Sequence, residues 1–240
     1  MLRDHRPYWL KKLMVRYEEW WARRWLRPNF TTMGDGFFIH FPWYVKVNGP
    51  NISLGEHSHM VAGPDRPIYF HTWVHGEHAG HISIGRYALI SPNVRISSAS
   101  SVTLGDGVML ANSVYISDAD WHDLYDRNQI IGTTRPVVLE DNVWLGDSVT
   151  VNKGVTIGRN SIIGSCSNVV KDIPANVIAA GNPAVVIRPL DPERKVTGRE
   201  AMFADFAAMQ RGQDYLDHYT LDKNSLWGYL RHKFRPRPGD

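Results

Sequence analysis

Aliphatic residues recur every six positions through the middle of the chain, with one step of eight and one long break. Another small or β-branched residue lies two positions before each of them. Such alternation is typical of a short strand, in which successive side chains point to opposite sides. Gly, Asn or Asp often follows, and these residues accept the positive φ of a sharp corner. The repeated positions are Ile84, Ile90, Ile96, Leu104, Leu110, Ile116, Leu139, Leu145, Val151, Ile157, Ile163 and Val169.

Six residues therefore correspond to one strand and one corner, and three such units close a triangular coil. Stacked coils form parallel sheets around an aliphatic interior. An amphipathic helix would need apolar residues every three or four positions, which this stretch lacks. The pattern predicts a parallel β-helix. Two earlier fragments, Val45–Val47 and Ile52–Gly55, fit less regular starting coils.

The long break in the repeat is a candidate functional loop. The step from Ile116 to Leu139 takes 23 residues where the repeat predicts six, so about 17 residues leave the coil wall. The loop contains His122, with aspartates at positions 118, 120 and 123. A neutral imidazole can accept a proton near neutral pH, and a carboxylate or carbonyl on its other nitrogen would orient it. A solvated surface histidine is the alternative.

Residues 137–190 are similar throughout to the hexapeptide-repeat acyltransferases, above all to galactoside and maltose O-acetyltransferases and to sugar O-acetyltransferases of surface-polysaccharide pathways. The most specific segments are Asn142–Gly146, Lys171–Pro174 and Ala179–Ala184. The resemblance implies an all-β, left-handed parallel β-helix with sites between the subunits of a homotrimer. It also implies acetyl transfer from acetyl-CoA to a hydroxyl of a saccharide or saccharide-like acceptor, with His122 as general base and no metal.

The resemblance also implies roles for individual residues on the coenzyme side. Trp144 would form a wall of the reaction centre, although a tryptophan at an outward strand position can also simply pack on a neighbour. Backbone groups of three residues would contact the pantetheine arm, and two cations would bind phosphates. The former are Gly146, Asp147 and Ser165, and the latter are Lys171, for which a solvated surface charge is the alternative, and Arg188.

The acceptor side departs from the family pattern. Ser91 occupies the place of an acceptor-binding Asn, Trp121 precedes the histidine where many relatives have Asn or Gly, and Val185 replaces a residue that is often basic. Ser91 and Asn112 remain candidates to line the acceptor pocket. The identity of the acceptor therefore does not follow from the sequence.

The two ends carry the basic charge. Residues 1–28 have a net charge of +5 and residues 223–240 of +4, so the +3 of the chain leaves −6 for its middle. A nucleic-acid-binding body would need a basic face, which this distribution disfavours. We divide the chain into an N-terminal helix (1–28), a β-helix domain with loop 117–136 (29–190) and a helical extension with a basic tail (191–240).

Residues 8–26 carry aromatic and basic residues at helical spacing, and Pro28 would end this amphipathic helix. It would either pack on its own or a neighbouring subunit, which we favour, or bind an anionic bilayer. A short helix is expected over residues 199–210. The basic, aromatic tail over residues 227–237 is expected to dock on another chain or to stay mobile.

Several features bear on location and metals. No apolar run reaches about 18 residues, and the N-terminal residues lack the pattern of a signal peptide, so the expected location is cytoplasmic, at most on the inner face of a membrane. Cys166 is a single cysteine and is expected to be structural. The histidine-rich stretch 57–81 is expected to form an irregular loop without a metal site. His57 and His59 would share a face if they lie on a strand.

Two other functions remain open. A γ-type carbonic anhydrase uses the same solenoid, but it needs three histidines converging on zinc, and only His81 and His122 lie near suitable coils. A non-catalytic scaffold is the other alternative.

Overall fold

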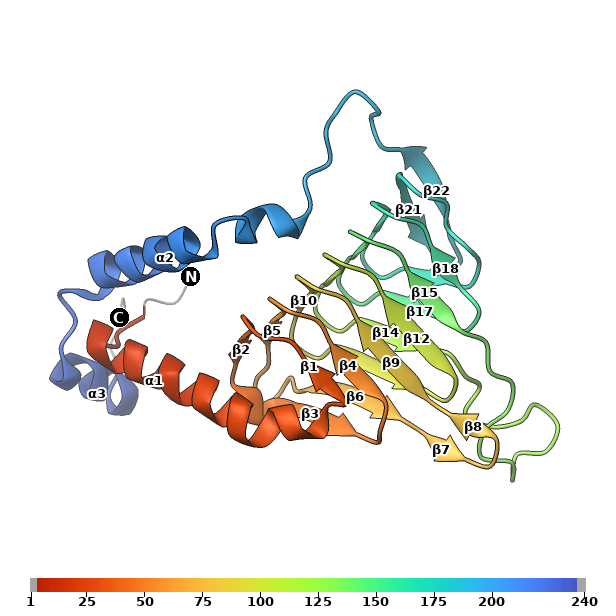
Figure 1. Cartoon of the computed structure of the whole chain (residues 1–240), viewed down its shortest axis with the longest axis horizontal. Helices are drawn as coiled ribbons and strands as arrows, with labels where there is room; N and C mark the ends of the chain where they lie inside the picture. Colours follow the sequence, from red (N-terminus) through yellow and green to blue (C-terminus); the bar gives the residue numbers. More distant parts are fainter. Residues whose placement is uncertain (1–3, 237–240) are drawn as a thin grey trace.

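The computed structural model describes residues 4–236 and is a stack of coils with helices at one end (Figure 1). Each coil passes through three sheets in turn, named A, B and C here, and consecutive coils pair in parallel. Sheet A contains β1 (Thr32–Met33), β4 (Ile52–Leu54), β9 (His81–Ile84), β12 (Ser101–Leu104), β15 (Val137–Leu139) and β18 (Thr156–Ile157). The parallel stacking predicted from the six-residue repeat is confirmed.

Sheets B and C complete the coils. Sheet B contains β2 (Phe38–His40), β5 (His59–Val61), β10 (Leu89–Ile90), β13 (Met109–Leu110), β16 (Trp144–Leu145), β19 (Ile162–Ile163), β21 (Val177–Gly181) and β22 (Ala184–Pro189). Sheet C contains β3 (Val45–Asn48), β6 (Ile68–Thr72), β11 (Arg95–Ser98), β14 (Tyr115–Ser117), β17 (Thr150–Val151) and β20 (Asn168–Val169). The strands β21 and β22 pair antiparallel and close one end of the stack.

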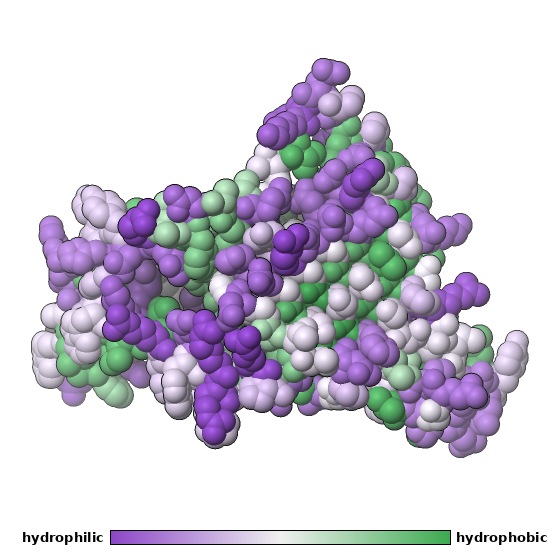
Figure 2. Space-filling view, in the orientation of Figure 1, coloured by the Kyte–Doolittle hydropathy of each residue, from purple (hydrophilic) through white to green (hydrophobic). Residues whose placement is uncertain are grey.

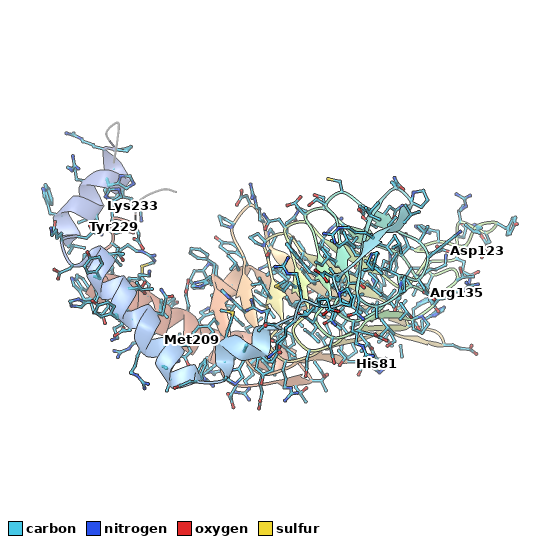
Figure 3. All side chains as sticks on the ribbon, turned by 90° about the horizontal axis from the view of Figure 1, so that it is seen from above. His81, Asp123, Arg135, Met209, Tyr229 and Lys233 are labelled. Atoms are coloured by element: carbon cyan, nitrogen blue, oxygen red, sulfur yellow. The ribbon has the colours of Figure 1, made fainter. Side chains whose placement is uncertain are left out.

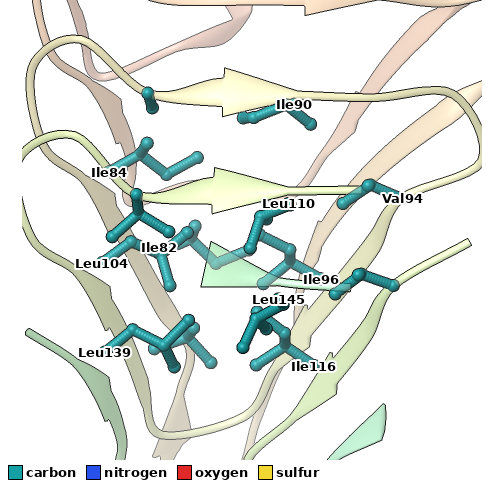
Figure 4. Close-up of a cluster of buried hydrophobic side chains, with 14 of the residues drawn as sticks. Ile82, Ile84, Ile90, Val94, Ile96, Leu104, Leu110, Ile116, Leu139 and Leu145 are labelled. Atoms are coloured by element: carbon teal, nitrogen blue, oxygen red, sulfur yellow. The ribbon is translucent and has the colours of Figure 1, made fainter. Parts of the chain in front are cut away.

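The repeated aliphatic residues form the core. All twelve of them are buried, and side chains from all three sheets meet inside the coils (Figure 4). Ile96 pairs with Ile116, and Leu139 pairs with Ile157. The first pair spans two residues more than the second because the step of eight lies in the earlier coil. Ala99 and Ser100 provide that extra length at the corner between sheets C and A, so the stacking of inward residues is preserved.

Polar ladders hold the corners between the coils. Asn142, Asn160 and Asn176 all have positive φ and lie at the same corner of successive coils. The Asn142 side-chain amide donates to Asn160 Oδ1 at 3.0 Å, and that of Asn160 donates to Asn176 Oδ1 at 2.7 Å. Asparagine tolerates left-handed backbone, and the stacked amides bond one another, so one residue type meets both demands of the corner.

The N-terminal helix covers the first coil. The helix α1 (Tyr8–Trp21) continues as a π-helical segment (Ala22–Leu26) and a 3-10 turn (Arg27–Asn29), so the prediction of a helix over residues 8–26 is confirmed. Glu18, Ala22 and Leu26 are buried against the body of the same chain. None of the helices among residues 4–236 is long and apolar enough to cross a membrane.

The C-terminal residues differ from the prediction. A 3-10 helix (Arg199–Phe203) leads into α2 (Phe206–Leu221), which is longer than the short helix expected over residues 199–210, and α3 (Leu226–Phe234) follows. The tail contacts its own chain, with the His232 ring stacked on His5 at 3.9 Å; Arg237 lies outside the described residues. Asn224 Nδ2 donates to the Asp4 and Arg6 carbonyls at 2.7 and 3.0 Å. Because the partners of these bonds are 218 to 220 positions apart in the sequence, a local residue pattern does not predict them.

The histidine-rich stretch is ordered rather than an irregular loop. His71 lies in β6, and residues 74–79 form a hairpin of β7 (Val74–His75) and β8 (His78–Ala79) because the backbone pairs across the turn. His57 has a positive φ at a corner, whereas His59 lies in β5, so the two do not share a strand face. Burial, with a smaller contribution from His40, lowers the pKa of His59 to about 4.

Candidate functional site

The loop over residues 117–136 is anchored by a buried aspartate. Asp118 is fully buried and accepts hydrogen bonds from Ser98 Oγ at 2.7 Å, from the Ala99 amide at 2.8 Å and from the Ser100 amide at 2.9 Å. Two of these donors belong to the extra residues of the eight-residue step. One carboxylate therefore satisfies the irregular corner of one coil and fixes the start of the loop on the next.

The other two aspartates near His122 also have structural partners. Asp120 forms an ion pair with Lys153 and accepts from Thr133 Oγ1 at 2.7 Å; these two contacts, the lysine first, lower the pKa of its carboxyl. Asp123 accepts from the Tyr125 and Asp126 amides, which lowers its own pKa. The imidazole of His122 is exposed, and no residue among 4–236 bonds to it. The orienting carboxylate expected for His122 is thus absent from its own described chain.

The residue before His122 is held firmly. Trp121 Nε1 donates to Tyr115 Oη at 3.1 Å, and its ring packs on Trp73 at a centroid distance of 5.7 Å. Trp73 stacks in turn on His71 at 4.8 Å. The β7–β8 hairpin and the loop therefore support each other at one corner. The six-residue repeat predicted the loop but not the hairpin, so sequence reasoning missed Trp73.

Five of the predicted residues lie along a single corner, between sheets B and C. Asn112, Asp147 and Ser165 occupy the same position on successive coils: the Ser148 amide donates to the Asn112 carbonyl, and the Cys166 amide donates to the Asp147 carbonyl. Ser91 and Gly146 lie one position earlier in their coils. Cys166 has a positive φ at this corner and is exposed, so it is not part of the buried wall.

The face of sheet B holds two more of them. Met109, Trp144 and Ile162 are cross-strand neighbours in one outward row, and Ile178 pairs with Arg188 further along it. Trp144 is 44% exposed. The segment that follows β22 runs over this row and encloses a hollow of about 330 Å³ lined by Trp144 and Arg188. Arg199 Nε fastens the segment by donating to the Tyr87 carbonyl at 2.7 Å.

Two cations of this hollow were missed by sequence reasoning. Arg194 and Lys195 line it together with Arg188, and Asp191 is also present. Their segment lies outside the repeat and has no strand or helix pattern of its own. The only signal available was the local charge, since residues 188–199 contain four Arg or Lys against two acidic residues.

Lys171 lies at the corner between sheets C and A, two residues past the Val151–Val169 pair, on the coil that follows Lys153. The loop with His122 leaves the same corner, because it joins β14 of sheet C to β15 of sheet A. In a three-sided coil this corner faces away from sheet B. Asp123 accordingly marks the loop at the edge of the molecule (Figure 3). One chain does not bring His122 to Trp144 or Arg188.

A metal site has little support from the arrangement. Among residues 4–236, no three His, Cys, Asp or Glu side chains of one chain gather in a way that could hold an ion. His81, the second histidine considered for zinc, has its Nδ1 at 2.7 Å from the Ala79 carbonyl.

Residues 136–171 match the family described as bacterial transferase hexapeptide (six repeats). These residues carry the hexapeptide repeat of that family. It is 39% identical over 132 residues to a galactoside O-acetyltransferase of Escherichia coli, covering 54% of this chain and 61% of that one. It is 29% identical over 168 residues to a putative lipopolysaccharide biosynthesis O-acetyltransferase of the same species, covering 66% and 81%.

The solved structures agree with the hexapeptide-repeat assignment. A hexapeptide-repeat-containing acetyltransferase from Vibrio cholerae superimposes with a TM-score of 0.51 at 29% identity, covering 71% of this chain and 81% of that one. The chain spans 61–62% of the length of the curated relatives that it matches at 38–39% identity.

Proposed function

We propose that the chain is an acetyl-CoA-dependent O-acetyltransferase that modifies a hydroxyl of a saccharide or saccharide-like acceptor. The similarity to galactoside O-acetyltransferase and to other sugar acetyltransferases supports the reaction class. The observation that carries the proposal is that the predicted site residues lie at separate places on the coil. His122 and Lys171 lie at one corner of the coil, while Trp144, Arg188 and the residues between sheets B and C lie on the opposite side.

Such a division is complete only in an oligomer. The C–A corner of one copy placed against sheet B of the next would bring His122 to Trp144, and three identical contacts close a ring. Exposed apolar side chains run in rows across a coil face, which supports packing between copies (Figure 2). We therefore include a homotrimer in the proposal, with a left-handed coil as in the family that the sequence resembles.

The donor would lie along the corner between sheets B and C. Gly146 N–H already donates to the Ile163 carbonyl at 2.8 Å, so it is not available for a ligand. The amides of Asp147 and Ser165 have no acceptor among the described residues. They could therefore donate to the pantetheine arm, as the resemblance implies. Arg188 with Arg194 and Lys195, and Lys171 of the neighbouring copy, would supply positive charge for phosphates.

His122 would act as the general base. Its imidazole takes the proton of the acceptor hydroxyl, whose oxygen then attacks the thioester carbonyl. The Asp147 N–H is available to bond the resulting oxyanion. When the carbon–sulfur bond breaks, the imidazolium returns the proton to the leaving thiolate, and no covalent acyl-enzyme forms. Ser91 and Asn112, on the same corner as Asp147, would line the acceptor pocket.

The test is release of free thiol from acetyl-CoA in a screen of galactosides and other saccharide acceptors. We expect acceptor-dependent release, and we expect His122→Ala to lower turnover about 10²-fold or more because a positioned base is lost. Acetyl-CoA affinity should change little. His218→Ala, on α2 and away from the proposed site, is the matched control. Full turnover in His122→Ala would remove this histidine from the mechanism, and a chain that binds no acetyl-CoA would refute the activity.

A further inference from the structure

The helix α1 has one buried face and one exposed aromatic face. One face is buried: Glu18 lies against the first coil, where Oε1 accepts from the Phe41 amide at 3.1 Å and Oε2 lies 3.6 Å from His40 Nδ1. The other face carries Trp9, Leu13, Tyr17 and Trp20, spaced by four, four and three residues, which places them in one row along the helix. We call this row the aromatic face of α1.

The aromatic face is exposed to solvent in the single chain. Its side chains are 54%, 57%, 52% and 53% exposed, in sequence order. Isolated apolar residues on a surface need no explanation, but a contiguous row indicates a binding surface. Tryptophan and tyrosine combine an apolar ring with a polar group, and such side chains favour the boundary between hydrocarbon and water.

Positive charge accompanies this row. Arg16 and Arg24 lie on the same side of the helix, and neither forms an ion pair within residues 4–236. Residues 8–26 contain five Lys or Arg and two Glu. The two glutamates do not offset the charge of the row, because Glu18 is buried on the other face and Glu19 pairs with Arg23 at 3.0 Å.

The helix α2 also exposes aromatic residues, but its charged residues differ from those of α1. It exposes Tyr215 and Tyr219 at 70% and 75%, yet its described ion pairs are acidic ones: Asp217 binds Lys11 at 2.8 Å and Asp214 binds Lys12 at 3.1 Å. Exposed aromatic residues thus occur on both helices, with Arg16 and Arg24 beside the row on α1 and Arg211 in line with the two tyrosines on α2. The helix α2 has one Arg and two Asp, whereas residues 8–26 have five Lys or Arg and two Glu, so the positive charge is greater on α1.

We propose that the aromatic face of α1 binds the headgroup region of an anionic lipid bilayer. The rings would enter the interface while Arg16 and Arg24 contact lipid phosphates. A second copy is a poorer occupant, because a two-fold contact of this row with itself would place the same cations against each other. The helix lies at the end of the coil stack remote from β22 (Figure 1), so a bound bilayer would leave the hollow on sheet B open. The proposal does not depend on the acetyltransferase activity.

The experiment is co-sedimentation of the full chain with vesicles of phosphatidylcholine alone or with added phosphatidylglycerol. We expect binding to the anionic vesicles that weakens with salt. Trp9→Ala/Trp20→Ala and Arg16→Gln/Arg24→Gln should each lower the partition coefficient about tenfold or more. Tyr215→Ala/Tyr219→Ala on α2 is the matched control and should bind as the unaltered chain does.

Three outcomes would overturn the proposal: equal binding to neutral vesicles, unchanged binding by both α1 variants, or a smaller oligomer in the tryptophan variant, which would make the row a contact between copies. The arginine variant changes only exposed charges, so it remains informative if the tryptophan variant fails to fold. Thiol release with a soluble acceptor should stay unchanged in both α1 variants, which separates this proposal from the activity.

Discussion

At the scale of single residues, Asp118 joins two irregularities of the repeat. Its carboxylate binds the amides of the two-residue excess at Ala99 and Ser100 and begins the loop that carries His122. The sequence showed both irregularities, but the spacing did not indicate that one buried carboxylate stabilises both. Its two neighbouring aspartates were equal candidates by sequence, and the structure separates the three by their burial and by their partners.

Replacing Asp118 tests this connection. Asp118→Ala leaves one buried and one half-buried amide and the buried Ser98 hydroxyl without this acceptor, so we expect the free energy of unfolding to fall by about 3 kcal/mol. Thermal unfolding followed by circular dichroism measures the change. Asp126→Ala, in the exposed part of the same loop, should unfold within a degree or two of the unaltered chain. Equal melting of both variants would contradict the anchoring role.

At the scale of elements, the loop over residues 117–136 and the β7–β8 hairpin form one support. The repeat predicted the loop, its length and its corner, because each is a departure from a fixed period. It did not predict the hairpin or the ring contact between Trp73 and Trp121, since side-chain pairing between two insertions has no periodic signal. The helix α3 escaped prediction for a related reason: it is nine residues long and its partners lie at the other end of the chain.

The hydrogen bond between Trp121 and Tyr115 is the part of this support that can be removed most cleanly. Trp121→Phe keeps an aromatic ring and loses the donor, while Tyr115→Phe loses the acceptor. We expect each to lower kcat about tenfold through looser positioning of His122, with KM for acetyl-CoA and the pH profile nearly unchanged. The double variant should be no worse than either single one, because both remove the same bond. Additive losses in steady-state kinetics would contradict a positioning role.

At the scale of the whole molecule, the predicted site residues are distributed over opposite sides of one coil. The sequence identified the inward residues nearly completely, because burial dictates their type and period. The hollow on sheet B could not be anticipated, since residues 190–197 follow no pattern and obtain their place only from the completed coil. The domain boundaries at residues 28 and 190 and the roles of the site residues stay predictions.

A mixed oligomer tests whether sites lie between copies. His122→Ala and Trp144→Ala/Arg188→Glu should each be inactive alone. In trimers assembled at random from both, about a quarter of the sites combine an intact His122 from one copy with an intact sheet B from its neighbour. Co-expression should therefore restore about a quarter of the thiol release, whereas mixing the assembled proteins should restore little. No recovery after co-expression would place each site within a single chain.

Between Thr72 and Val169, every change in coil length occurs at the corner between sheets C and A: the hairpin, the two extra residues and the loop. The other two corners keep a constant length, so insertions are confined to one corner of the stack. Evolution can lengthen or exchange the segments at that edge without disturbing any ladder of paired strands. Related chains with the same coils can therefore differ in acceptor, because similarity of the coils reflects common descent and not a common acceptor.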